Sequence, residues 1–398
     1  MVPSARQAYN KSFTEEKYNA FLQDIDRAYP GTVEFRIAET PVFVPATFTE
    51  KMLDTCEHIV DLITTPAFKE KTERAIPASL RVANENDHPH FIAFDFGVCT
   101  AADGTPEPQL IEMQGFPTLF GFQVLLTDRY RTHFTVPEKA SPYLNGYTKE
   151  SYLGLLKEML LGDHDPKQVI LLELFPHQQK TRIDFYYTQD VTGIQPVCLT
   201  ELIKEGRKLY YLRDGVKTEI RRIYNRIIFD ELQQQDAAVQ QQGRILFEDL
   251  EVEWISHPNW FYRISKYTLP FLHHPCIPET FFLSDIKQLP ADLQHYVLKP
   301  LFSFAGQGVK IDVTTKDLED ITDPAHWILQ RKVSYSPVIQ TPDEPAKAEI
   351  RIFYFWKDGW ERPIAVNNLA RLSKGKMIGV NYNKNKTWVG GSACFFEL

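Results

Sequence analysis

The sequence predicts an α+β protein with an additional α/β unit, and three observations indicate this class. A length of 398 residues exceeds one average domain, so two or three domains are expected. Residues 14–29 and 150–160 carry apolar side chains at helical spacing, on either side of strand-like stretches. An apolar strand at 169–175, a helical stretch ending at Gly193 and a second strand at 194–199 follow the order of a βαβ unit.

The composition argues against several classes of partner. Apolar residues make up 43% of the chain, charged residues 24%, and the formal net charge is −8. This balance argues against broad binding to nucleic acids or anionic membranes, and no apolar run approaches the roughly 18 residues of a spanning helix. The N-terminal stretch lacks the apolar core of a secretory signal, and the five scattered cysteines form no CxxC pair. We therefore expect a cytoplasmic protein without nucleic-acid or membrane partners, and the oligomeric state stays open.

The N-terminal part is predicted to combine helices with one hairpin. Thr47 and Glu50 form a capping-box pattern ahead of apolar residues at helical spacing. The stretches HFIAFDFGV (90–98) and PQLIEMQG (108–115) are typical of strands, and the turn-rich CTAADGTPEP joins them. The pair therefore predicts a β-hairpin.

This hairpin carries a candidate metal site. Glu112 and Gln114 share a face of the second strand because they are two residues apart, and Asp95 can lie opposite them on the first. Carboxylate and amide oxygens are hard ligands that suit Mg²⁺. Asp95, Glu112 and Gln114 are therefore the predicted metal ligands, although Asp95 and Glu112 could instead be ordinary solvent-facing strand residues.

A second hairpin and an arginine-rich segment follow the βαβ unit. KLYYL and VKTEI flank an Asp-Gly turn, which is typical of a tight hairpin. In the segment IRRIYNRIIFDEL, Arg222 and Arg226 either line a substrate cleft or form a salt-bridged surface, and we take them as candidate substrate-binding residues. The glutamine-rich stretch 233–242 is predicted to be a surface helix or a linker.

The stretch VLKPLFSFAGQGVKI (297–311) places a lysine and two glycines between apolar strands. Glycine lets backbone N–H groups approach an anion, because no side chain intervenes and positive φ is tolerated. Lys299 adds a point charge suited to phosphate. Gly306 and Gly308 alone are weak evidence, since a hairpin tip also needs glycine. The pattern is neither a Rossmann loop, which has a third glycine and leads into a helix, nor a Walker loop.

Further residues surround this loop. Lys266 stands at the head of a predicted helix, and WILQRKV (327–333) is a short strand with a polar end. AEIRIFYFWKDG places Glu349 and Arg351 on one face by the period of two. In the closing segment, Arg371 either binds phosphate or substrate or solvates a loop.

This succession resembles the nucleotide-binding half of the ATP-grasp superfamily over about residues 255–398. The resemblance implies that Lys266 and Lys299 reach the phosphates of ATP. It also implies that Arg351 stabilises charge during phosphoryl transfer, with Lys299 and Arg351 as the catalytic residues. The loop over the phosphates and the strand end that faces adenine would comprise Gly306, Gln307, Gly308, Gln330, Arg331, Lys332 and Val333.

The early hairpin resembles the metal site of circularly permuted ATP-grasp proteins, the glutathionylspermidine synthase-like group, in which an Asp…Glu-x-Asn hairpin comes first. Here Gln114 stands in place of the asparagine, and Ala93 stands where some relatives have arginine. The resemblance spans roughly residues 85–398. It implies a helical segment with the metal hairpin (1–165), an α/β substrate-side domain (166–255) and a nucleotide-binding part (256–398).

The resemblance implies an ATP- and Mg²⁺-dependent ligase that activates a small-molecule or peptide carboxylate as an acylphosphate for attack by an amine or a similar nucleophile. Arg222, Arg226 and Arg371 would contact the substrate. Two alternatives stay open. One is an ATP-binding protein of the same fold with little or no ligase activity, acting as a partner-dependent subunit. The other is an α+β binding protein that takes no nucleotide and uses the two glycines only as a turn.

Overall fold

Five β-sheets, partly covered by helices, make up the computed structural model, which describes residues 1–302, 307–375, 378 and 383–397. The α-helices of this part are α1 (Pro3–Ser12), α2 (Glu15–Ala28), α3 (Ala46–Ile63), α4 (Ala67–Lys71), α5 (Phe120–His133), α6 (Lys149–Leu161), α7 (Arg182–Thr192), α8 (Phe229–Gln233), α9 (Ala237–Gly243), α10 (Asn259–Arg263) and α11 (Thr315–Glu319). The strands are β1 (Val42–Val44), β2 (Phe91–Thr100), β3 (Pro106–Gln114), β4 (Val169–Glu173), β5 (Gln195–Cys198), β6 (Ile203–Glu205), β7 (Lys208–Arg213), β8 (Val216–Ile220), β9 (Arg222–Asn225), β10 (Glu253–Ile255), β11 (Thr280–Phe282), β12 (Tyr296–Pro300), β13 (Lys310–Ile311), β14 (Trp327–Arg331), β15 (Lys347–Phe355), β16 (Ile364–Ser373), β17 (Gly390–Ser392) and β18 (Cys394–Phe396).

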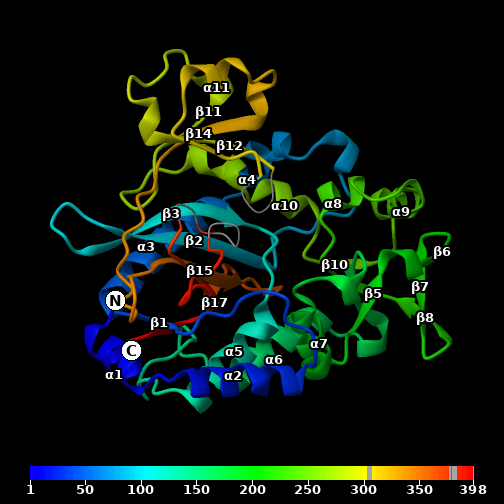
Figure 1. Cartoon of the computed structure of the whole chain (residues 1–398). Coiled ribbons are helices and arrows are strands. Elements are labelled where there is room, and N and C mark those ends of the chain that lie inside the picture. Colours follow the sequence, from blue (N-terminus) through cyan, green and yellow to red (C-terminus); the bar gives the residue numbers. More distant parts are fainter. Residues whose placement is uncertain (303–306, 376–377, 379–382, 398) are drawn as a thin grey trace.

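The central sheet joins the early hairpin to the late strands, in the antiparallel order β17-β16-β15-β2-β3 (Figure 1). Strand β2 is buried on both faces because its side chains alternate between two apolar clusters. Ile92, Phe94 and Phe96 pack in the cluster that includes α3, whereas Phe91 and Ala93 pack in the cluster that includes α5 and α6. The predicted hairpin at 90–115 is therefore confirmed, and it lies at the centre of the molecule.

The predicted βαβ unit is confirmed in a parallel sheet of order β10-β9-β4-β5 (Figure 1). Helix α7 crosses over between β4 and β5 and ends at Gly193, whose φ of 79° is the left-handed conformation that glycine tolerates. The second hairpin is confirmed as β7 and β8, with Asp214 and Gly215 both at positive φ. The glutamine-rich stretch, predicted as a surface helix or a linker, includes most of α9.

A smaller antiparallel sheet, of order β11-β14-β12-β13, lies at the top of Figure 1 with α11. The helix predicted near 262–272 is instead two pieces, α10 and a 3-10 helix over Lys266–Phe271. The side chain of Ser265 accepts a hydrogen bond from the backbone of Tyr267, and Pro270 lacks an N–H, so a continuous α-helix is interrupted here. Lys266 nevertheless stands at the head of a helical turn, as predicted.

The predicted capping box at Thr47 and Glu50 is wrong. Helix α3 begins at Ala46, and its N-cap is Pro45, whose side chain makes no capping hydrogen bond. The backbone oxygen of Pro45 already accepts hydrogen bonds from the N–H groups of Phe48 and Thr49. The helix therefore begins one residue before the first residue of the motif.

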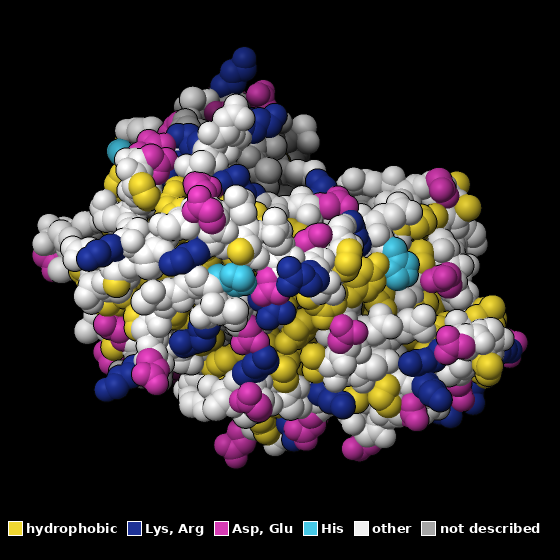
Figure 2. Space-filling view, turned by 60° about the horizontal axis from the view of Figure 1, so that its bottom comes forward, with side chains coloured by type: hydrophobic (Ala, Val, Ile, Leu, Met, Phe, Trp, Pro, Cys, Tyr) yellow, Lys and Arg dark blue, Asp and Glu magenta, His cyan; other side chains and the backbone are white. Residues whose placement is uncertain are grey.

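The two ends of the chain lie side by side, because β1 pairs in parallel with β18 (Figure 1). The first and third predicted segments, 1–165 and 256–398, thus share two sheets. Lysine and arginine side chains are interspersed with aspartate and glutamate over the face drawn in Figure 2. Across the residues that the structure describes, no helix is both long enough and apolar enough to cross a membrane.

The end of the central hairpin is fixed against α10 at Gly115. Its N–H donates to the carbonyl oxygen of Ile264 at 2.8 Å, and an added Cβ would lie 2.3 Å from the carbonyl oxygen of Trp260. We expect Gly115→Ala to lower the free energy of unfolding by about 1–3 kcal/mol, because buried backbone must move aside. The measurement is urea denaturation followed by circular dichroism.

Gly154 in α6 is the matched control, since an added Cβ there meets nothing within 4 Å. We expect Gly154→Ala to raise the free energy of unfolding by about 0.5–1 kcal/mol, the usual preference for alanine over glycine in a helix. Equal stability of the two variants would contradict the close approach at Gly115.

Candidate functional site

One face of the central sheet changes abruptly from apolar to charged. The opposed pairs Phe91–Phe355 and Ala93–Phe353 of β2 and β15 belong to the apolar cluster. The next pair on the same face, by the period of two, is Asp95–Arg351. This boundary places charged side chains next to a dry core, where electrostatic interactions are stronger than in water.

The Asp95–Arg351 pair is buried and bidentate. Arg351 Nε donates to Asp95 Oδ1 and Arg351 Nη2 donates to Asp95 Oδ2, both at 2.6 Å. Asp95 is 0% exposed and Arg351 is 8% exposed. The planar fork of arginine matches a carboxylate in this geometry, which makes the pair both strong and well oriented. The alternative that Asp95 is a solvent-facing strand residue is wrong.

The carboxylate of Glu349, one pair further along the face, is also held within the cluster. It pairs with Arg371 of β16, and its Oε2 accepts a hydrogen bond from the hydroxyl of Tyr335 at 3.0 Å. Arg371 Nη2 also lies 3.5 Å from Asp95 Oδ2. Burial raises the pKa of Glu349 and that of Tyr335. Arg371 therefore links two carboxylates of neighbouring strands.

Strand β3 adds Glu112 and Gln114, and Glu112 is the register partner of Asp95, as the hairpin predicted. Gln114 Nε2 donates to Glu112 Oε1 at 3.1 Å and to Asp95 Oδ2 at 3.3 Å. Lys266 Nζ lies 4.0 Å from Glu112 Oε2. Burial would raise the pKa of Glu112, but Lys266, Lys299 and the two arginines lower it to about 2. Glu112 therefore stays ionised.

Lys299 of β12 reaches the same cluster from the smaller sheet. Its Nζ donates to Gln330 Oε1 at 2.6 Å and to the carbonyl oxygen of Ile111 at 3.1 Å. Burial lowers the pKa of Lys299 to about 8, although Glu112 opposes this shift. Gln330 is 1% exposed, and its Nε2 has no hydrogen-bond partner. The early acids and the late cations are therefore brought together, as the sequence suggested.

The glycine loop connects β12 to β13, which pair antiparallel. Gly308 has a φ of 71°, the conformation that glycine permits and other residues rarely adopt. Gly306 lies outside the described residues. Gln307 and Gly308 are exposed.

At the strand end predicted to face adenine, several backbone and side-chain groups already bind other residues of the protein. The backbone N–H groups of Arg331 and Lys332 donate to the carbonyl oxygens of Glu279 and His295, both at 2.8 Å. Their side chains pair with Asp292 and Asp312. Adenine recognition by residues 330–333 stays a prediction.

The chain then crosses the polar face of the central sheet. An added Cβ on Gly97 would lie 3.0 Å from side-chain atoms of both Val333 and Tyr335. The N–H of Ser336 donates to the carbonyl oxygen of Val98 at 2.9 Å. This segment therefore covers the cluster beyond Glu349.

The oxygens of Asp95, Glu112 and Gln114 do not converge on one point for a metal ion. Both oxygens of Asp95 accept from Arg351, and Gln114 presents its amide nitrogen to the two carboxylates, as two anions require. Lys266 faces the second oxygen of Glu112. Within the described ranges no group of three or more His, Cys, Asp or Glu side chains could hold a metal. As arranged, the predicted ligand set does not fit Mg²⁺.

The two candidate substrate arginines of β9 lie at opposite ends of the parallel sheet. Arg226 follows the carboxyl end, where its Nη1 donates to the carbonyl oxygen of Pro117 at 2.8 Å and its guanidinium lies over Phe116 at 4.7 Å. Arg226 is therefore attached to the segment that follows Gln114. Arg222 stands at the amino end, paired with Glu253 and bonded to the carbonyl oxygen of Met159 at 2.9 Å. The structure does not bring Arg222 to the cluster.

The sequence reasoning did not single out Glu173, the last residue of β4. It is 6% exposed, and its Oε1 accepts a hydrogen bond from the N–H of Leu174 at 2.7 Å. Burial raises the pKa of Glu173 to about 8, Arg226 opposes this shift, and Glu231 adds to it. Ligands of parallel sheets bind at the carboxyl ends of strands, so an acid that ends an apolar strand was the available signal.

Stability should depend on pH through Glu173. The folded protein keeps a proton that the unfolded chain releases above pH 4.5, so stability is lost as pH rises toward about 8. The free energy of unfolding of Glu173→Gln, taken relative to that of the wild type, should therefore increase by on the order of 1–3 kcal/mol from pH 5 to pH 8. Urea denaturation at both pH values measures this. Glu70→Gln, at an exposed position of α4, is the control, and parallel pH profiles of wild type and Glu173→Gln would contradict the assignment.

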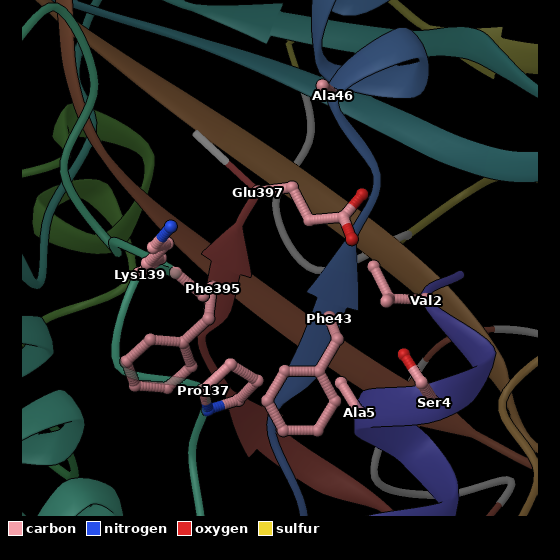
Figure 3. Close-up of a pocket in the computed structure, with 10 residues that line it drawn as sticks. Val2, Ser4, Ala5, Phe43, Ala46, Pro137, Lys139, Phe395 and Glu397 are labelled. Carbon is pink, nitrogen blue, oxygen red and sulfur yellow. The ribbon is translucent and has the colours of Figure 1, made fainter.

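A hollow near the chain ends is separate from the charged cluster (Figure 3). It has a volume of about 340 Å³, with the rings of Phe43 and Phe395 on its wall and Lys139 and Glu397 on different sides. None of the site residues predicted from the sequence lines it.

These observations define a mixed α/β protein whose central antiparallel sheet carries a buried cluster of lysines, arginines and carboxylates. No protein-family model and no curated protein sequence matches the chain. Among solved structures, the chain is similar to a glutathione synthetase-like effector from Globodera pallida, determined without ligand. The TM-score is 0.62 and the identity is 10%, and the alignment covers 96% of each chain. At this identity the likeness shows a shared fold and nothing more.

Proposed function

We propose that the cluster binds the phosphates of ATP and that the protein activates a carboxylate for attack by an amine or a similar nucleophile. The observation that carries this proposal is the convergence of Lys266, Lys299, Arg351 and Arg371 from four separate elements. A triphosphate needs such a concentration of positive charge, and Gly308 provides exposed backbone at positive φ in the connection that follows the strand of Lys299. The glutathione synthetase-like fold agrees with this class of ligase.

The proposed reaction has two steps. A carboxylate oxygen of the substrate attacks the γ-phosphorus, the bond to the β-phosphate oxygen breaks, and ADP leaves with that electron pair. The amine nitrogen then attacks the acyl carbon, phosphate leaves, and the amine proton passes to solvent or phosphate. Lys266 and Lys299 would stabilise the charge that builds on the phosphoryl oxygens. Magnesium enters this scheme only with ATP, as part of the substrate.

Arg226 is the proposed contact for a substrate carboxylate. Its Nε is buried without a hydrogen-bond partner, and its guanidinium adjoins the segment after Gln114. The two substrates are proposed by chemical class, a carboxylic acid and an amine or similar nucleophile.

The second candidate is an ATP-binding protein of the same fold without ligase activity. It is favoured by the complete pairing of Asp95, which leaves the early hairpin without free carboxylate oxygens on that strand. This protein would act as a partner-dependent subunit.

A thermal-shift titration followed by a turnover assay tests both candidates. ATP at about 100 times its dissociation constant should raise the melting temperature by about 2–4 °C, because binding stabilises the native state. ADP release in the presence of a mixture of carboxylates and amines then supports the ligase, and binding without ADP release supports the second candidate. The absence of any shift with ATP, ADP or a non-hydrolysable analogue contradicts nucleotide binding.

A further inference from the structure

The carboxylate of Asp95 is already occupied by other side chains of the protein. Arg351 makes two hydrogen bonds of 2.6 Å to it, Gln114 makes one of 3.3 Å, and Arg371 lies at 3.5 Å. Asp95 is also 0% exposed. A metal ion that took over both oxygens of Asp95 would displace the bidentate guanidinium, and this would leave the buried positive charge of Arg351 without its partner.

The charge balance of the cluster also disfavours a metal. Lys266, Lys299, Arg351 and Arg371 oppose Asp95, Glu112 and Glu349, so the named side chains carry one net positive charge. A divalent cation would be repelled by these cations at close range and low dielectric, whereas a polyanion would be attracted. The net charge of the cluster therefore disfavours binding of a metal cation and favours binding of a phosphate anion.

Arg351 has the properties that this arrangement needs. Its planar fork holds both oxygens of one carboxylate. Its position comes from β15, opposite Asp95 in register, so its placement follows from strand pairing and not from a flexible loop.

We propose that Arg351 takes the place of a protein-bound metal ion at Asp95, so that this cluster holds phosphate through its own cations and no divalent ion binds Asp95. In this role Arg351 is a permanent counter-ion that orients Asp95 and supplies positive charge next to the phosphates. The nucleotide part of this inference rests on the proposed function, whereas the metal part does not.

The first test uses the wild-type protein. Mn²⁺ titration followed by electron paramagnetic resonance should show no stoichiometric bound ion in the absence of nucleotide. Isothermal titration calorimetry should give dissociation constants for ATP in Mg²⁺ and in EDTA that differ by less than about threefold. One tightly bound Mn²⁺ per chain in the absence of nucleotide overturns the metal part of the inference. ATP binding that appears only with Mg²⁺ overturns the part in which the protein's own cations hold the phosphates. If ATP does not bind in either buffer, the proposed function fails, and the Mn²⁺ titration still decides the metal part.

The second test opens the carboxylate. Arg351→Gln removes the guanidinium. Unlike the wild type, this variant should bind about one Mn²⁺ per chain, because Asp95 and Glu112 then face each other without the arginine that pairs with Asp95. The double variant Asp95→Asn, Arg351→Gln should lose that ion again. A folded Arg351→Gln protein that retains no Mn²⁺ contradicts the inference.

Arg263→Gln is the matched control for exposing any buried carboxylate. Arg263 is 2% exposed and holds Glu85 in the same bidentate manner, with distances of 2.7 and 3.1 Å. Arg263→Gln should bind no Mn²⁺. If it binds Mn²⁺, the binding by Arg351→Gln is not specific to Asp95. Circular dichroism reports folding of each variant. Arg351→Lys, which keeps the charge without the fork, is the second variant if Arg351→Gln fails to fold, and it should bind ATP equally in Mg²⁺ and EDTA.

Discussion

Replacing Lys299 by methionine is expected to weaken ATP binding at least about 100-fold, because a buried ammonium beside phosphate contributes several kcal/mol that an apolar side chain cannot replace. The Nζ of Lys299 lies between Gln330 and the backbone of Ile111, at the meeting point of two sheets. Methionine preserves much of the volume of the side chain, so the variant should fold. Isothermal titration calorimetry with ATP measures the change.

Lys287→Met is the control for this prediction, since Lys287 is exposed on the segment that joins β11 to β12 of the same smaller sheet. Its dissociation constant for ATP should match that of the wild type within experimental error. If folded Lys299→Met protein binds ATP as tightly as this control, the phosphate-binding role of Lys299 is wrong.

Asp95→Ala is expected to lower the free energy of unfolding by about 3–5 kcal/mol, the usual effect of removing one partner from a buried ion pair. The variant leaves Arg351 buried and without its bidentate acceptor, and it leaves Gln114 without one of its two acceptors. Urea denaturation at pH 7 measures the loss.

Two comparisons make this prediction specific. The double variant Asp95→Ala, Arg351→Met should be more stable than Asp95→Ala alone, because the unpaired charge is removed with its partner. Glu158→Ala, which breaks the exposed pair with Lys357, should cost less than about 1 kcal/mol. An Asp95→Ala variant that loses no more stability than Glu158→Ala would show that the central pair contributes little.

The local pattern predicted much of the secondary structure for a clear reason. Strand alternation has a period of two, so the shared face of Glu349 and Arg351 follows from counting along the strand. The pairing of Glu112 with Asp95 agrees with the predicted hairpin, but it depends on a register shift between Asp95 and Phe96. The βαβ unit was equally accessible, because its apolar strands and helix C-cap glycine are all local signals. These predictions are confirmed.

Local patterns failed where a neighbouring residue changed the outcome. The capping-box motif at Thr47 was wrong because the backbone oxygen of Pro45 already starts the helix. The helix predicted near 262–272 is broken at Ser265 and Pro270. The spacing of Arg222 and Arg226 separates them along a strand, but it could not show that only Arg226 meets the segment after Gln114, because that depends on how β9 packs in the sheet.

By itself the sequence determined which residues share a strand face, where the hairpins turn and which segments carry the acids and the cations, because these depend on neighbours within a few positions. Only the tertiary structure decided that Arg351 binds Asp95, a residue 256 positions away, and that Lys299 reaches across to the backbone of β3. These partners are set by the register between strands that are distant in the sequence, and that register is fixed because both faces of β2 are buried. The same burial excludes water from Asp95, so its carboxylate is paired with side chains of the protein.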